Sequence, residues 1–168
     1  MYDEAMVKPM REDLTQLGVK ELRTAEEVDA ALQNHQGTTL VVVNSVCGCS
    51  AAGARPAVER VMRHPVQPDN YVTVFAGQDS EATAQARRYF DGYEPSSPQM
   101  GLLKDGKLVF MLERQHIEGN LPMDIAACIN EAFDQHCGNV LQEVTTESTQ
   151  MECSIGEESD GKWWQVWK

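Results

Sequence analysis

The fold is decided by residues 39–49, Thr-Leu-Val-Val-Val-Asn-Ser-Val-Cys-Gly-Cys, where a long apolar run leads directly into two cysteines. An unbroken run rich in β-branched residues is typical of a central strand that is buried on both faces of a sheet. A helical pattern over about 51–63 follows, so Cys47 and Cys49 lie between the carboxyl end of a strand and the start of a helix. In open α/β sheets, functional sites form at this position.

Apolar periodicity on either side of this segment predicts helices and strands in alternation. The expected elements lie at about 3–17, 19–23, 24–35, 39–46, 51–63, 71–75, 79–90, 100–103, 107–112 and 120–137. Alternation predicts an α/β fold, a mixed sheet with parallel central strands flanked by helices. Asp105-Gly106, between the last two apolar runs, predicts that an antiparallel hairpin closes the sheet.

Several helix ends and helix faces can also be predicted. Thr24 and Glu27 form a capping box, and Asp79 or Ser80 is expected to cap the helix that reaches about residue 90. Apolar spacings of three and four predict the buried face of the first helix and of the last one. These stripes are Met6, Met10, Leu14 and Leu17, and Leu121, Ile125, Ile129 and Phe133.

The composition excludes several classes of function. The chain has 168 residues, 42% hydrophobic, which suffices for one domain with a sizeable core. Its net charge of −12 argues against binding to nucleic acid or to an anionic membrane, because both need clustered positive charge. There is no apolar run of membrane-spanning length and no signal-peptide pattern, so we expect a cytoplasmic protein. Five sparse cysteines predict no disulfide framework.

Residues 138–168 differ from the rest of the chain. They are rich in glutamate, yet they hold all three tryptophans, Trp163, Trp164 and Trp167. We interpret them as an extension of a domain over 1–137, because about 30 residues rarely fold alone. The tryptophans are expected to pack on the core, Asp160-Gly161 to form a turn, and Cys153 to be incidental.

The residues alone leave three interpretations of the Cys47-Gly48-Cys49 pair. In the first, the N–H groups of a helix start stabilise a thiolate, the nucleophile of thiol chemistry, and Arg55 adds positive charge one turn further on. A disulfide within this small ring, which Gly48 tolerates best, would suit exchange or isomerisation better than strong reduction. The alternatives are two idle thiols, or a soft-ligand pair for copper or zinc.

Several separate motifs resemble one family. A Cys-x-Cys pair after the first long strand, with Ser97-Pro98 before a hairpin, resembles the plan of the thioredoxin-like fold, whose cis-proline loop lies opposite its cysteines. The closer resemblance is to the bacilliredoxin family, over about residues 1–137. The segments that carry it are Val42–Cys49, Ala54–Pro56, Val74–Asp79, Pro95–Pro98, Ile117–Gly119 and Ala132–Cys137.

The resemblance implies an activity and a site. Bacilliredoxins belong to bacteria that use bacillithiol as their low-molecular-weight thiol, and they remove it from mixed disulfides on proteins. By this resemblance, Cys47 would attack the bacillithiol sulfur and Cys49 would resolve the adduct. Gly48, Ser97 and Pro98 would line the substrate site. Ser50 departs from the Ala-Ala-Gly that commonly follows the pair in the family, and we expect it to cap the helix.

The resemblance also implies partners. Bacillithiol would be a thiol co-substrate, with no bound cofactor or metal, and bacillithiolated client proteins and a bacillithiol-regenerating reductase system would be the partners. The alternatives are a general disulfide isomerase or oxidant, and a thioredoxin-fold module for metal binding or interaction. Cys137 matches a family cysteine and is either a third redox cysteine or a helix-end thiol without a catalytic role. Cys128 is expected in the core.

Overall fold

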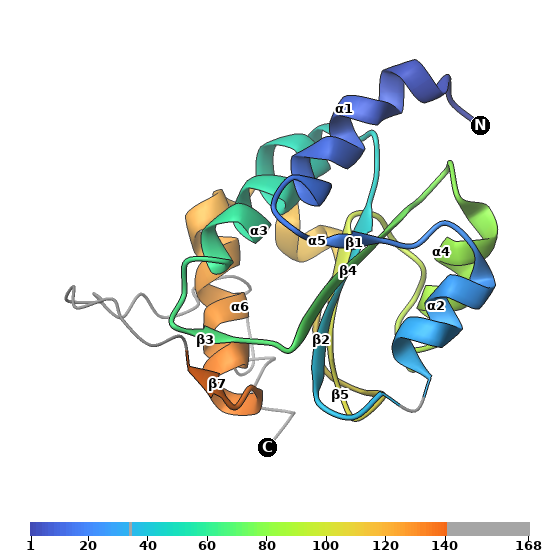
Figure 1. Cartoon of the computed structure of the whole chain (residues 1–168). Helices are drawn as coiled ribbons and strands as arrows, with labels where there is room; N and C mark the ends of the chain where they lie inside the picture. The colour runs from blue at the N-terminus through green and yellow to red at the C-terminus, as the bar shows by residue number, and fades with distance from the viewer. Residues whose placement is uncertain (34, 141–168) are drawn as a thin grey trace.

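The structure is a computed structural model that describes residues 1–33 and 35–140. Its centre is a five-stranded sheet in the order β1-β4-β2-β5-β6, with helices on both faces (Figure 1). The strands are β1 (Lys20–Glu21), β4 (Asn70–Phe75), β2 (Thr38–Asn44), β5 (Gln99–Lys104) and β6 (Lys107–Leu112). The sheet is mixed, and together with the helices on its two faces it forms a three-layer domain. This architecture confirms the predicted fold class.

β2 is the central strand, and all seven of its residues are buried. It pairs in parallel with β4 and antiparallel with β5, so both of its edges are covered as well as both faces. This environment explains the unbroken apolar run, because an unpaired polar side chain would be costly there. β5 and β6 form the predicted hairpin, with positive φ at both Asp105 (50°) and Gly106 (76°), as a type I′ turn requires.

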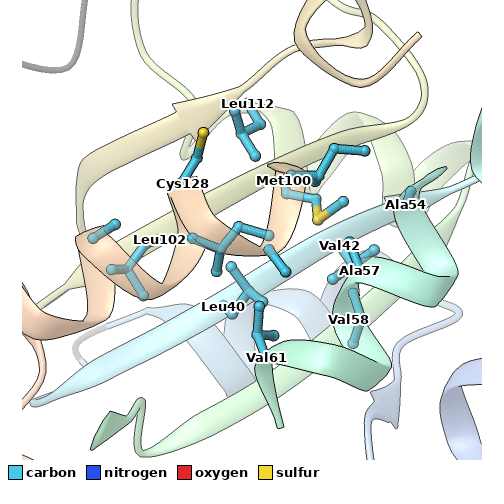
Figure 2. Close-up of a cluster of buried hydrophobic side chains, with 14 of the residues drawn as sticks. Leu40, Val42, Ala54, Ala57, Val58, Val61, Met100, Leu102, Leu112 and Cys128 are labelled. Atoms are coloured by element: carbon cyan, nitrogen blue, oxygen red, sulfur yellow. The ribbon is translucent and has the colours of Figure 1, made fainter. Parts of the chain in front are cut away.

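Five helices form the outer layers. α1 (Glu4–Thr15), α3 (Arg55–Val61) and α6 (Pro122–His136) cover one face, and α2 (Ala25–Leu32) and α4 (Ser80–Arg87) cover the other (Figure 1). Two short segments, the π-helical η1 (Ser50–Ala54) and α5 (Arg114–Ile117), lie beside the sheet end described below. Each face has its own core, and Figure 2 shows part of the one that contains Leu40, Val42, Val58, Val61 and Cys128.

Two of the predicted helix faces need correction. Met6 and Leu121, both assigned to apolar stripes, are 45% and 59% exposed. Leu121 precedes α6 in extended backbone, so the helical periodicity does not apply to it. α1 continues through Pro9, and its buried side chains are Val7, Arg11 and Leu14. Apolar spacing does not predict this face, because the buried residue at its centre is an arginine.

Arg11 explains both the face of α1 and the start of α4. Its guanidinium is 2.5 Å from a carboxylate oxygen of Glu21 and 2.7 Å from one of Asp79, and it lies over the Phe75 ring. Asp79 occupies the N-cap position of α4 but makes no capping hydrogen bond with its side chain, because its carboxylate accepts from Arg11. The capping box of Thr24 with Glu27 is present as predicted.

A second, two-stranded sheet was not predicted. β3 (Val66–Gln67) pairs antiparallel with β7 (Asn139–Val140), and two-residue strands are too short to show a period. β7 thus joins the beginning of the 138–168 segment to the domain. The tryptophans, the Asp160-Gly161 turn and Cys153 lie outside the described residues, and the domain boundary stays a prediction. Within residues 1–33 and 35–140, no helix is long and apolar enough to cross a membrane.

Candidate active site

The strand register brings three chain segments together at one end of the sheet. Val42 of β2 pairs with Met100 of β5, and Met100 pairs with Leu112 of β6, beside which it lies in Figure 2. From this row the chain leaves β2 toward Cys47, and it leaves β6 toward Arg114. The loop before β5 ends here too. The cysteine pair, the proline loop and α5 therefore meet at the carboxyl end of β2.

Cys47 lies where a helix would have its N-cap. The helical segment begins at Gly48 and continues through η1 into α3. The backbone N–H of Ser50 is directed at the Cys47 sulfur, with a distance of 3.3 Å between nitrogen and Sγ. Acceptance of an N–H three residues later is the pattern of an N-cap side chain, here with sulfur in place of oxygen. The helix start thus favours negative charge on this sulfur.

The two thiols of the pair have opposite pKa shifts. Partial burial alone would raise the pKa of Cys47, but hydrogen bonds from the Cys49 thiol, the Ser45 hydroxyl and the N–H groups of Ser50 and Cys49 together lower it. Burial raises the pKa of Cys49, and its hydrogen bond to Cys47 and the charge of Cys47 raise it further. Of the two thiols, Cys47 is therefore the one that loses its proton more readily.

A buried polar network supports the loop from below. Oδ1 of Asn44 accepts from the Ser45 N–H (2.8 Å), the Ser50 hydroxyl (2.8 Å) and Nη1 of Arg55 (3.1 Å). The same Arg55 nitrogen donates to the Ser45 carbonyl, and Nε lies 2.8 Å from a carboxylate oxygen of Asp13 in α1. The network ties the end of β2 to η1, α3 and α1, and so fixes the path of the chain just before Cys47.

This network corrects one expectation. Ser50 does not cap the helix with its side chain, because its hydroxyl is bonded back to Asn44. Arg55 uses its guanidinium to support the loop from beneath, and the expected effect of its charge on the thiolate stays a prediction.

The loop before β5 faces Cys47. The Ser97-Pro98 peptide is cis, as the resemblance implies, and the Ser97 carbonyl oxygen lies 4.0 Å from the Cys47 sulfur. A Cβ added at Gly48 would meet nothing within 4 Å, so this side of the pair is open. The structure thus brings Gly48, Ser97 and Pro98 to Cys47, and their role as substrate-lining residues remains a proposal.

Two residues of this region, Ser45 and Arg114, were not predicted from the sequence. Ser45 is buried, and its hydroxyl both accepts from the Cys47 N–H (3.4 Å) and lowers the pKa of Cys47. Arg114 is exposed, its backbone N–H donates to the Ser96 hydroxyl, and its charge acts on both cysteines. No motif marks either residue. The contact of Ser45 with Cys47 depends on the turn after β2. The position of Arg114 depends on the register of β6 against β5.

The structure describes two further cysteines, Cys128 and Cys137. Cys137 follows α6 at the opposite end of the sheet, where burial raises the pKa of its thiol. The fold therefore does not bring Cys137 to Cys47, although its thiol is free. Cys128 is 2% exposed in the core, as predicted, and it is disulfide-bonded, which was not expected. No group of three His, Cys, Asp or Glu side chains within the described ranges could hold a metal ion.

Comparisons with known proteins agree with this geometry. Residues 2–137 match the disulphide isomerase family. The bacilliredoxin of Koribacter versatilis is 52% identical over 82% of this chain and 95% of its own, and that of Bacillus licheniformis is 54% identical over 81% and 95%. A solved structure with a thioredoxin fold, 14% identical, covers 70% of this chain and 95% of its own with a TM-score of 0.51.

The class of protein follows from the fold and these relatives. It is a thiol–disulfide oxidoreductase with a thioredoxin fold. Within that class, the chain belongs to the bacilliredoxin family, because more than half of the aligned residues are identical over most of its length.

Proposed function

We propose that this oxidoreductase removes bacillithiol from mixed disulfides on client proteins, with Cys47 as the nucleophile and Cys49 as the resolving thiol. The observation that carries the assignment is the Ser50 N–H directed at the Cys47 sulfur at 3.3 Å, which favours negative charge on that sulfur. The opposite directions of the two pKa shifts, lower for Cys47 and higher for Cys49, support the same order. The choice of bacillithiol is supported by the relatives' name, bacilliredoxin.

The proposed reaction has two exchanges. The Cys47 thiolate attacks the bacillithiol sulfur of the mixed disulfide, so that a Cys47–bacillithiol disulfide forms and the client leaves as a thiolate. Cys49 then loses its proton and attacks the Cys47 sulfur, which releases bacillithiol and leaves a Cys47–Cys49 disulfide. The client disulfide is reduced by two electrons and the pair is oxidised by two. Attack by Cys49 is helped once Cys47 is no longer charged, because that charge is one cause of its raised pKa.

The proposal also names a thiol co-substrate and two kinds of partner. Bacillithiol is the thiol co-substrate, the partners are bacillithiolated proteins, and a reductase system that regenerates bacillithiol restores the dithiol. We place the reaction in the cytoplasm, where glutathione-type or equivalent thiol pools keep cysteines reduced.

Trapping by intact mass tests this proposal. Cys49→Ala incubated with a bacillithiolated client should gain one bacillithiol on Cys47, and Cys47→Ser should gain none. Cys137→Ala serves as the control for a thiol outside the site and should turn over like the unmodified protein. Full turnover by Cys49→Ala would contradict the resolving role, and absence of any adduct would contradict the function.

The disulphide isomerase family match favours a second candidate, a general isomerase. A glutathionylated client in the same assay separates the two. Transfer from bacillithiol alone supports the first proposal, and equal transfer from both clients supports the second.

A further inference from the structure

We propose that Arg114 binds a carboxylate of the low-molecular-weight thiol carried in the mixed disulfide, so that the enzyme prefers anionic thiol adducts over neutral ones. The inference rests on the proposed function and deepens it, because it assigns the chemical class of the co-substrate. It also assigns a binding role to Arg114, a residue that lies outside the sequence motifs described above.

The placement of Arg114 follows from the hairpin. Leu112 pairs with Met100, so the residue two positions after Leu112 lies level with the loop two positions before Met100. The backbone N–H of Arg114 accordingly donates to the Ser96 hydroxyl at 3.3 Å, and the next residue, Ser97, has its carbonyl 4.0 Å from the Cys47 sulfur. Arg114 therefore stands at the rim of the site, joined to the loop that faces the nucleophile.

The guanidinium is available to a ligand. The Arg114 side chain is 48% exposed, and its ion pair is with Glu118 one turn on, through Nε (3.1 Å) and Nη2 (3.2 Å). Among residues 1–33 and 35–140, Nη1 has no hydrogen-bond partner. Such exposed pairs are weak, so a ligand carboxylate can share or replace Glu118 at little cost.

The charge is also in the right place for a small thiol. The positive charge of Arg114 acts on Cys49 and, more weakly, on Cys47. A thiol bound through its sulfur to Cys47 can extend its other groups toward this rim, where the Ser96-Ser97 loop joins Arg114. In a chain of net charge −12, a half-exposed cation here, held only by a weak surface ion pair, is the local feature that attracts an anion.

Model thiols of one length but different charge test the inference. A client is loaded with 3-mercaptopropionate, 2-mercaptoethanol or cysteamine, which present a carboxylate, a hydroxyl or an ammonium group beyond the same short stem. The readout is the ratio of kcat/KM for the carboxylate adduct to kcat/KM for the hydroxyl adduct. The ratio cancels any general effect of a variant on the reactivity of the sulfurs.

The matched control is Arg63, an exposed arginine on α3 that also forms an ion pair four residues away, with Glu59. We expect Arg114→Gln to lower the ratio about three- to fivefold, the range of one exposed charge pair, while Arg63→Gln leaves it unchanged. Arg114→Lys should keep most of the preference, and Glu118→Gln should increase it. High salt should weaken the preference of the unmodified protein.

An unchanged ratio in Arg114→Gln, or an unmodified protein that prefers the hydroxyl adduct, would overturn the inference. Failure of the proposed function looks different, because the protein would then not accept a bacillithiolated client at all while the ratio for the model thiols could still be measured.

Discussion

At the scale of single residues, the reactivity of the site comes from hydrogen bonds to one sulfur. Cys47 and Cys49 are the same chemical group one residue apart, yet Cys47 receives donors from Ser45, Ser50 and Cys49, whereas the nearby charge of Cys47 raises the pKa of Cys49. Geometry rather than residue type therefore decides which cysteine attacks.

Replacement of Ser45 tests this explanation. Ser45→Ala removes the hydroxyl donor, so the pKa of Cys47 should rise by up to about one unit, the value of one hydrogen bond. Below that pKa the thiolate fraction, and with it the alkylation rate of Cys47, should fall up to about tenfold. Ser80→Ala, at an exposed serine, is the control. An unchanged pH profile would show that the Ser45 hydroxyl does not stabilise the thiolate.

At the scale of elements, the central strand is what carries the site. β2 was predictable because a strand buried on both faces carries an unbroken apolar run, here residues 40–43, and the hairpin was predictable from Asp105-Gly106. The two-residue strands β3 and β7 and the polar Asn44 network were not, because they depend on contacts between segments far apart in sequence. Cys47 could be identified because its motif is local in the sequence. Arg114 could not, because its place near the cysteines depends on the pairing of β6 with β5.

Close packing in β5 gives a prediction at this scale. Gly101 pairs with Val41 and Met111, and a Cβ there would lie 2.6 Å from Cε1 of Phe90 and 3.0 Å from Cδ1 of Leu108. Gly101→Ala should therefore lower the free energy of unfolding by about 1–3 kcal/mol in urea denaturation. Gly138→Ala, where a Cβ meets nothing within 4 Å, should have little effect. A Gly101→Ala protein as stable as the unmodified one would contradict the packing described for β5.

At the scale of the whole molecule, Arg11 links the N-terminal helix to the sheet. The guanidinium is 4% exposed and joins α1 to Glu21 of β1 and to Asp79 before α4. α1 also supplies Asp13 to Arg55 and the Met10 carbonyl to Asn44, so its attachment extends to the network beneath the cysteines.

Arg11→Met should reduce the free energy of unfolding by about 3 kcal/mol, because it removes a buried cation from Asp79 and leaves Glu21 with the exposed Arg23. Arg23→Met is the matched control, since Arg23 also pairs with Glu21 and Glu4 but is 52% exposed. Both variants change the net charge equally, and Arg23→Met should cost less than about 1 kcal/mol. Equal losses in urea denaturation would show that burial of Arg11 is not the source of its contribution.

The central claim is that Cys47 is the thiolate and Cys49 the protonated partner. The most direct test is the alkylation rate of each cysteine in the reduced protein as a function of pH, followed peptide by peptide with mass spectrometry. Cys47 should reach half of its maximal rate below the pH of an ordinary cysteine, and Cys49 above it, with Cys137 as the internal example of a thiol whose pKa is raised by burial. A lower midpoint for Cys49 than for Cys47, or identical midpoints, would contradict the account.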